Sequence, residues 1–156
     1  MYRLAIVVTV LIGIAVAAPA AKADHDSGPF GLGIIIGEPT GVSAKLFLSG
    51  SNAIAAAVAW SLSGNNNIQI QADYLYHRYE MISVSKGQLP VFFGIGGRYA
   101  LRDNADDVLG IRIPVGIANQ FANHPFDIFG EIVPIFDITP DTDFDLEGAI
   151  GARYYF

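Results

Sequence analysis

The sequence predicts an all-β protein, an eight-stranded antiparallel up-and-down transmembrane β-barrel that follows a cleaved signal peptide. Three observations support this fold class. The chain of 156 residues starts with a basic and then apolar leader. The rest of the chain alternates apolar residues with small or polar ones at a period of two. Charged residues make up only 15% of the chain, whereas an average soluble domain has about 25%.

The start of the chain has the three parts of a secretory signal peptide. A basic start at 1–3 precedes an apolar run over 4–18, and small residues at 21–23 provide a cleavage site. A membrane-spanning helix is the alternative, but it needs about 20 apolar residues, and Pro19 ends this run early. The predicted organisation is a cleaved signal peptide, a short periplasmic segment and a β-barrel domain, at 1–23, 24–30 and 31–156.

The chain after the leader contains no second apolar run of 18 residues, so any further membrane crossing must use strands. Clusters rich in Gly, Asn, Asp, Ser and Pro separate the alternating segments and predict turns. Stretch 78–88 is ambiguous, because Ile82 and Val84 either extend the preceding strand or belong to a longer hairpin loop. The eight predicted strands cover 31–37, 42–48, 53–62, 68–77, 89–101, 109–118, 126–138 and 144–156.

The composition of the two strand faces indicates which one meets lipid. In segment 68–77, for example, Ile70 and Tyr74 share one face, while Gln71 and Asp73 share the other. Alternating strands suit either a soluble lipocalin-type cup or a membrane barrel with the faces inverted. The less apolar face is mostly Ala and Gly with a few charges of both signs, which suits a narrow, filled interior. Because a charge facing lipid costs about 2–4 kcal/mol near the midplane, the sequence favours the membrane barrel.

The charged residues at inward positions are predicted to form a paired network, because an unpaired charge in a dry lumen is very costly. An eight-stranded barrel is only wide enough inside for side chains. We therefore interpret this network as structural filling, and the alternative is a polar path or gate for a small solute. The predicted members are Lys45, Asp73, Arg98, Arg112, Glu131, Asp145, Glu147 and Arg153.

Aromatic residues are predicted to form two belts at the membrane interfaces, as expected of a membrane barrel. With a periplasmic N-terminus and alternating strand directions, the two belts fall near opposite ends of the strands. The general preference of aromatic residues for strands is the alternative explanation. The predicted belt residues are Trp60, Tyr74, Tyr76, Tyr99, Tyr154 and Phe156.

No motif in the sequence predicts a reaction or a cofactor. The chain has no Cys, and its three His residues do not have the spacing of metal ligands. No Ser lies in a nucleophile elbow. The 15 acidic residues outnumber the 9 basic ones, which argues against a nucleic-acid partner. We expect no cofactor, no metal and no catalysis.

The last strand resembles the terminal strand of bacterial outer-membrane barrels, since 151–156 reads Gly-Ala-Arg-Tyr-Tyr-Phe. In such barrels a C-terminal Phe with alternating apolar residues is read by the barrel-assembly machinery. A larger part of the chain, about 31–156, resembles an uncharacterised family of small bacterial outer-membrane β-barrel domain proteins of OmpX-like size. The family brings no known reaction. The matching segments are 37–41, 60–61, 94–98, 112–116, 131–134 and 148–153.

Taken together, the residues and the resemblance predict an integral barrel of the cell outer membrane with a structural or interaction role and no catalysis. The first alternative is a narrow small-solute channel. Less favoured alternatives are a lipid-modifying barrel enzyme and a soluble periplasmic lipocalin-like binder. The expected partners are outer-membrane lipid and, through the C-terminal strand, the barrel-assembly machinery. The sequence does not indicate an oligomeric state.

Overall fold

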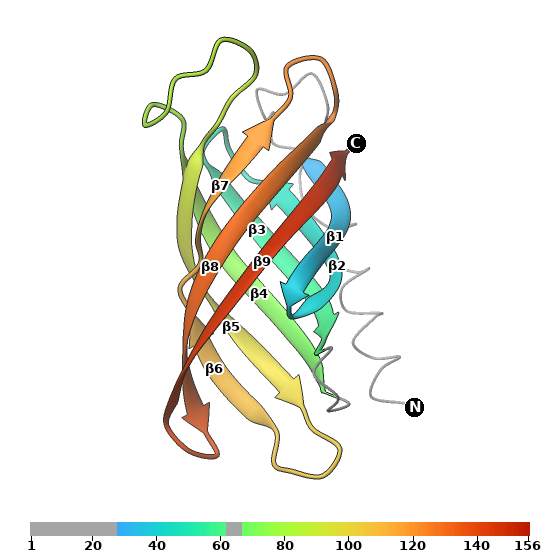
Figure 1. Cartoon of the computed structure of the whole chain (residues 1–156), viewed down its shortest axis with the longest axis vertical. Helices are drawn as coiled ribbons and strands as arrows, with labels where there is room; N and C mark the ends of the chain where they lie inside the picture. Colours follow the sequence, from blue (N-terminus) through green and yellow to red (C-terminus); the bar gives the residue numbers. More distant parts are fainter. Residues whose placement is uncertain (1–27, 62–66) are drawn as a thin grey trace.

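The computed structural model describes residues 28–61 and 67–156, so the predicted signal peptide lies outside the described residues. The described chain forms one antiparallel sheet that closes into a barrel (Figure 1). Neighbours in the chain pair with each other, and the ring closes where the first strand pairs with the last. The predicted all-β, antiparallel, up-and-down fold is therefore confirmed.

The strands lie close to their predicted positions, and most ends differ by one or two residues. The structure contains β1 (Phe30–Glu38), β2 (Thr40–Phe47), β3 (Asn52–Trp60), β4 (Ile68–Arg78), β5 (Val91–Leu101), β6 (Val108–Arg112), β7 (Val115–Gln120), β8 (Phe126–Thr139) and β9 (Asp143–Tyr155).

The predicted strand 109–118 is present as two segments, β6 and β7, which are separated at Ile113 and Pro114. Proline has no N–H to donate to a sheet, so it interrupts the regular ladder. The wall nevertheless stays closed, because the Gly94 N–H donates to the Pro114 carbonyl at 3.0 Å. Both segments pair with β5 and with β8. The nine strands therefore occupy eight positions around the ring.

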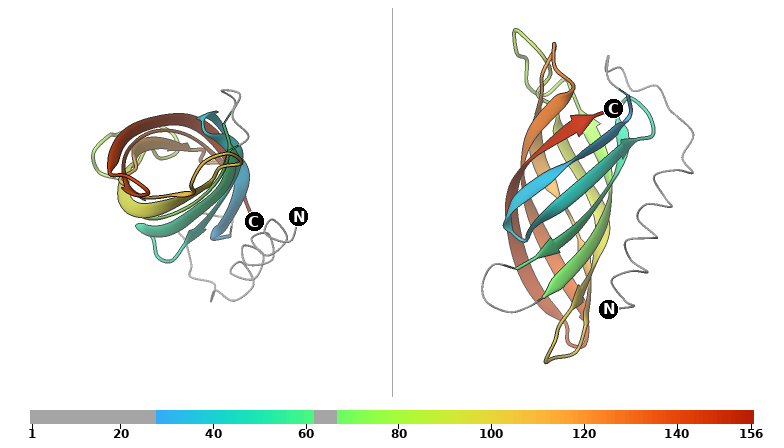
Figure 2. Two further views of the ribbon diagram at one scale, coloured as in Figure 1. Left: turned by 90° about the horizontal axis from the view of Figure 1, so that it is seen from below. Right: turned by 90° about the vertical axis from the view of Figure 1, so that its right-hand side faces the viewer.

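The barrel has two different ends. We call the end where β1 begins and β9 finishes the terminal end, and the opposite one the distal end (Figures 1 and 2). The chain between β4 and β5, residues 79–90, extends from the terminal end and contains no strand. An isolated bridge from Gln88 to Gln120 ties it to β7. Stretch 78–88 is therefore mainly a long loop, with only Arg78 belonging to β4.

The alternation of the strands places large apolar side chains on the outside of the barrel. Ile95, Ile132 and Ile150 are each at least 60% exposed, whereas the inward Arg112 is 1% exposed. No helix within 28–61 and 67–156 is long and apolar enough to cross a membrane. The outward apolar face and the inward charges follow the pattern that the sequence predicts for a membrane barrel.

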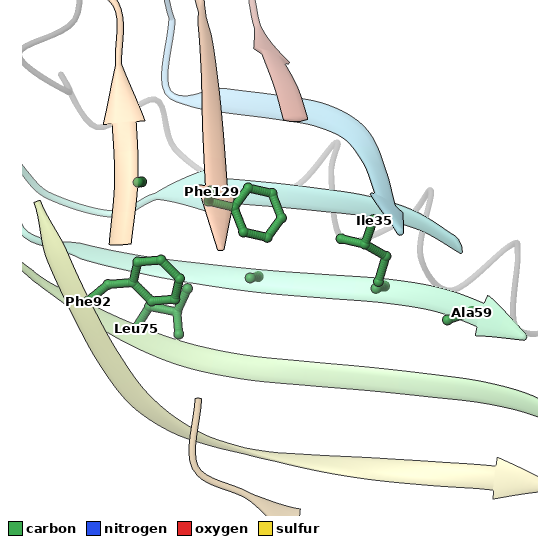
Figure 3. Close-up of a cluster of buried hydrophobic side chains, with 8 residues drawn as sticks. Ile35, Ala59, Leu75, Phe92 and Phe129 are labelled. Carbon is green, nitrogen blue, oxygen red and sulfur yellow. The ribbon is translucent and has the colours of Figure 1, made fainter. Parts of the chain in front are cut away.

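Part of the interior is apolar, and its rings fit against glycines. Figure 3 shows Phe92 and Phe129 among the buried side chains inside the barrel wall. A Cβ atom at Gly116 would overlap the Phe92 ring, and one at Gly151 would overlap the Phe129 ring. These inward glycines therefore leave room for the ring of one particular neighbour each, so that the narrow interior is closely packed.

Candidate functional site

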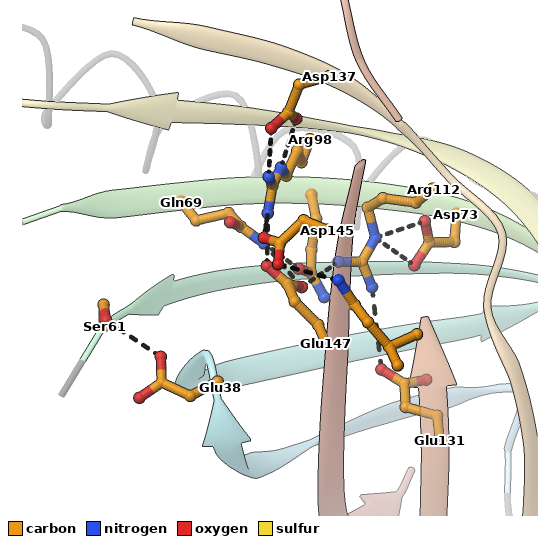
Figure 4. A network of polar contacts seen from close by, with 12 residues as sticks. Glu38, Ser61, Gln69, Asp73, Arg98, Arg112, Glu131, Asp137, Asp145 and Glu147 are labelled. Carbon is orange, nitrogen blue, oxygen red and sulfur yellow. Dashed lines mark hydrogen bonds and ion pairs between the residues drawn. The ribbon is translucent and has the colours of Figure 1, made fainter. Parts of the chain in front are cut away.

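The inward charges on β5, β8 and β9 meet around the guanidinium of Arg98. Two of its nitrogens, Nε and Nη2, donate to the two carboxylate oxygens of Asp137 at 3.1 and 2.7 Å. Its Nη1 donates to Glu147 at 2.7 Å and to Asp145 at 3.2 Å (Figure 4). Such two-pronged contacts between arginine and carboxylate are strong and directional. Arg98 on β5 therefore contacts β8 and β9, which lie two and three positions away around the ring.

A second arginine, Arg112 on β6, extends this cluster toward the centre of the barrel. Its Nε donates to Asp73 at 3.1 Å, and its Nη1 donates to Glu147 at 2.9 Å. Its Nη2 also lies 3.9 Å from a Glu131 oxygen. Glu147 thus bridges both arginines, and it accepts a further hydrogen bond from Gln69 at 3.3 Å. The resulting distal network consists of Gln69, Asp73, Arg98, Arg112, Glu131, Asp137, Asp145 and Glu147.

Two glycines make room for carboxylates of the distal network. A Cβ at Gly96 would overlap an oxygen of Asp73, which lies opposite it on β4. A Cβ at Gly110 would likewise overlap an oxygen of Asp137. The glycines that the sequence places on the inward face thus allow charged side chains to approach the wall closely.

The structure does not bring two of the eight predicted residues, Lys45 and Arg153, into the distal network. Arg153 donates from Nε to the Ser43 hydroxyl at 3.0 Å and lies over the Phe129 ring, 3.9 Å from its centroid. Within the described chain, neither Lys45 nor Arg153 has a carboxylate within ion-pair distance. A paired charge network would give Arg153 a carboxylate partner. In the structure its guanidinium instead contacts a hydroxyl group and the face of an aromatic ring.

Lys45 lies near the terminal end, where its Nζ is 2.7 Å from Nε2 of His77. Both side chains are 1% exposed. The ammonium group also faces the rings of Phe47 and Phe92, at 4.7 and 5.6 Å from their centroids. We call these four residues, together with Tyr155, the terminal plug, since Tyr155 also packs on Phe47.

Several interior polar residues were not predicted as members of the site. Asp137 and Gln69 belong to the distal network, and His77 belongs to the terminal plug. Asp127 is fully buried and accepts a hydrogen bond from the Tyr155 hydroxyl at 2.7 Å. The period-two alternation places all four at inward positions, so it was the signal that could have identified them.

The predicted belt residues lie on the outside of the barrel in two bands. Trp60 and Tyr99 lie near the distal ends of β3 and β5, and each is more than 40% exposed. The remaining four lie near the terminal end, where Phe93 joins them and packs against Tyr76 at 5.7 Å between ring centroids. Those four residues are Tyr74, Tyr76, Tyr154 and Phe156.

The polar interior fills the barrel with side chains that bind one another. Across the residues that the structure describes, no group of three or more His, Cys, Asp or Glu side chains is placed to hold a metal ion. In the distal network two arginines are held by carboxylates from β4, β8 and β9, and at the terminal end the rings of the plug lie against one another. The arrangement ties interior side chains of different strands to one another.

Comparison with known proteins shows a likeness in fold alone. No family model matches the chain, and no curated protein matches it. The structure is similar to the crystal structure of the N-terminal β-barrel domain of Pseudomonas aeruginosa OprF, with a TM-score of 0.59 and 12% sequence identity. The match covers 81% of this chain and 95% of that domain. The membership in an uncharacterised barrel family that the motifs suggest stays a prediction, and the comparison shows that the chain has the fold of a small β-barrel domain of the OprF type.

Proposed function

We propose that the chain is an integral β-barrel of the bacterial outer membrane, exported by a cleaved signal peptide, with a structural or interaction role and no catalysis. The observation that carries this proposal is the inverted distribution of side chains. Isoleucines, leucines and valines cover much of the outside, while arginines and carboxylates are buried around the axis. The fold that the chain shares with the OprF barrel domain is consistent with it.

The outside of the barrel supports a lipid environment. Between the two aromatic bands, outward positions such as Ile34, Ile95 and Ile150 are more than half exposed. A soluble monomer rarely exposes an apolar area of this extent. In a membrane these apolar side chains contact lipid instead of water. The two bands of aromatic side chains then lie at the two headgroup regions.

The filled interior supports a role other than conduction. Arg98 and Arg112 are held by carboxylates from β4, β8 and β9, so an ion entering the lumen would have to displace paired charges. At the terminal end, neighbouring ring centroids of the plug lie 5.1 to 6.0 Å apart. We therefore expect very small conductance at neutral pH in planar bilayers, and large reproducible steps would favour the small-solute channel instead.

Compartment and orientation are tested together by labelling single cysteines, because the natural chain has none. Asp106→Cys lies in the exposed turn at the distal end, and Ser85→Cys lies in the exposed loop at the terminal end. With periplasmic termini, a membrane-impermeant maleimide should label Asp106→Cys in intact cells and Ser85→Cys only after lysis. The protein should also fractionate with the outer membrane and migrate differently on gels before and after heating.

If intact cells are labelled at Ser85→Cys but not at Asp106→Cys, the barrel has the opposite orientation, with its termini outside the cell. Recovery of the whole protein in the soluble periplasmic fraction would reject the membrane barrel and favour the lipocalin-like binder. Altered lipid A in cells that express the chain would favour the lipid-modifying enzyme.

The C-terminal Phe156 is proposed to take part in recognition by the barrel-assembly machinery. Its side chain is 65% exposed beside Tyr154 and Phe30 at the terminal end, so little of the packing inside the barrel depends on it. Phe156→Ala should therefore lower the amount of folded barrel in the membrane several-fold in cells. The purified variant should still refold in detergent like the natural protein.

Phe144→Ala is the matched control, because Phe144 is a similarly exposed ring at the distal end. Equal losses of folded protein for both variants in cells would show that exposed aromatic residues matter generally and that Phe156 has no special part in assembly.

A further inference from the structure

The contacts of His77 determine which of its ring nitrogens carries the proton. Nδ1 lies 3.1 Å from the backbone carbonyl oxygen of Ser51. A carbonyl oxygen only accepts hydrogen bonds, so Nδ1 carries the hydrogen in this contact. Nε2 is then the acceptor for the hydrogen bond from Lys45 Nζ at 2.7 Å. With Lys45 as an ammonium group, which can only donate, this arrangement requires a neutral His77.

Protonation of His77 at Nε2 is incompatible with this arrangement. The nitrogen becomes a donor and no longer accepts from the ammonium group of Lys45, and the two side chains then carry the same charge. Both are almost completely buried, so water does not screen the repulsion well. Lys45 needs a different acceptor in the acidic state.

Asp127 on β8 offers that acceptor. Its carboxylate has no exposed surface, and Oδ2 accepts from the Tyr155 hydroxyl, while Oδ1 has no hydrogen-bond partner. A buried carboxylate oxygen without a partner is costly. Lys45 and Asp127 are close enough to interact electrostatically. Movement of the ammonium group from His77 to Asp127 would therefore satisfy a donor and an orphaned acceptor together.

The other ionisable groups around the pair have neighbours of their own. The Tyr79 ring stacks beside His77, and the Arg153 guanidinium is held by Ser43 and Phe129. Glu131 lies 3.9 Å from Arg112 and, like Asp127, interacts electrostatically with Lys45, so it is the competing acceptor. The titratable or charged groups that face Lys45 and His77 are Tyr79, Asp127, Glu131, Arg153 and Tyr155.

We propose that Lys45, His77 and Asp127 form a proton-driven switch at the terminal end of the barrel. Above the titration of His77, Lys45 donates to the neutral imidazole and lies against Phe47 and Phe92, which keeps the terminal plug closed. One proton taken up at Nε2 releases Lys45 to Asp127. The plug then loses the cation that its rings and His77 hold together, and the terminal end loosens in acid.

Nuclear magnetic resonance of the folded barrel in detergent micelles tests the switch directly. Side-chain labelling of histidine and lysine is simple here, because the sequence has only three of each. The exposed His124 and Lys86 provide internal references. At neutral pH His77 should be the neutral tautomer with the hydrogen on Nδ1. As the pH falls, the Lys45 signal should shift with the same midpoint as the His77 ring, while Lys86 does not respond.

Three results would overturn the switch. The first is a His77 that carries its hydrogen on Nε2 or stays neutral throughout the range in which the barrel is folded. The second is a Lys45 signal that does not change when His77 takes up its proton. The third is a Lys45 that keeps its contact with protonated His77 by accepting the hydrogen bond as a neutral amine.

Two variants separate the switch from general effects of acid. His77→Gln keeps an acceptor for Lys45 and a donor for Ser51 but does not titrate, so the acid-induced shift of Lys45 should disappear. Asp127→Asn removes the charged acceptor, so His77 should still titrate while the Lys45 shift becomes much smaller. Heat-modifiable migration shows that each variant is folded. An unchanged Lys45 shift in either folded variant contradicts the proposal.

The consequence for the plug is measured as conductance in planar bilayers at pH 7.5 and pH 5. The natural protein should show more frequent opening in acid, and His77→Gln should not. Equal behaviour of the natural protein at the two pH values would reject the loosening of the plug. The spectroscopic test needs only a folded barrel in micelles, so its outcome is independent of whether the protein resides in the outer membrane.

Discussion

Arg112→Met is expected to lower the free energy of unfolding by about 3–5 kcal/mol, the range observed when one partner of a buried ion pair is removed. The guanidinium is 1% exposed and makes contacts below 3.2 Å with Asp73 and Glu147. Methionine fills a similar volume but provides no charge or donor. The buried Asp73 would then lose its cation and would have to remain desolvated or take up a proton, and Glu147 would keep only Arg98.

The measurement is urea unfolding of the barrel in lipid bilayers, with Arg78→Met as the control. Arg78 forms an exposed pair with Glu80 at 3.4 Å, and exposed pairs contribute only about 0–1 kcal/mol. A loss for Arg112→Met as small as that for Arg78→Met would show that the distal network contributes little to stability.

Ile150→Lys is expected to destabilise the barrel by about 2–4 kcal/mol in a bilayer, because lysine then faces hydrocarbon near the midplane. Ile150 lies in the middle of β9 with its side chain 64% exposed. In a water-soluble barrel the same change at an exposed position would have a small effect. The substitution therefore measures which solvent surrounds the outer face.

Ile138→Lys provides a matched control, since Ile138 is also an outward isoleucine but lies next to the distal end of β8. Near an interface the cost of lysine falls to about 0–1 kcal/mol. Urea unfolding of both variants in bilayers should give a clearly larger loss for Ile150→Lys. Two equally small losses would contradict a lipid-facing outer surface and with it the proposed location.

The period of two predicted the direction of almost every strand side chain. Gln71 and Asp73 point inward and Ile70 points outward, as the alternation requires. The same pattern placed His77 and Asp127 inside, although neither was recognised as part of a site. A neutral histidine that accepts from lysine is not found by looking for charges, whereas the acidic Asp127 at an inward position was overlooked.

The contacts between interior side chains could not be predicted. Arg98 and Glu147 are 49 residues apart in the chain, and they meet only because strand tilt and register bring them to the same height on different sides of the ring. Arg153 lies beside Asp127 in the register of β8 and β9, yet its guanidinium contacts Ser43 and Phe129. Which partner an interior side chain contacts therefore depends on the space that its neighbours leave.

The amino-acid sequence by itself determined the fold class, the approximate strands and which residues face inward, because alternation and turn residues act over a few neighbouring positions. Only the tertiary structure decided how those inward residues combine. In the structure six of the eight predicted charged residues lie in the distal network, whereas Lys45 contacts His77 in the terminal plug. One predicted strand is also divided at Pro114. These outcomes depend on closure of the ring, which sets the height and distance of side chains that the chain itself keeps far apart.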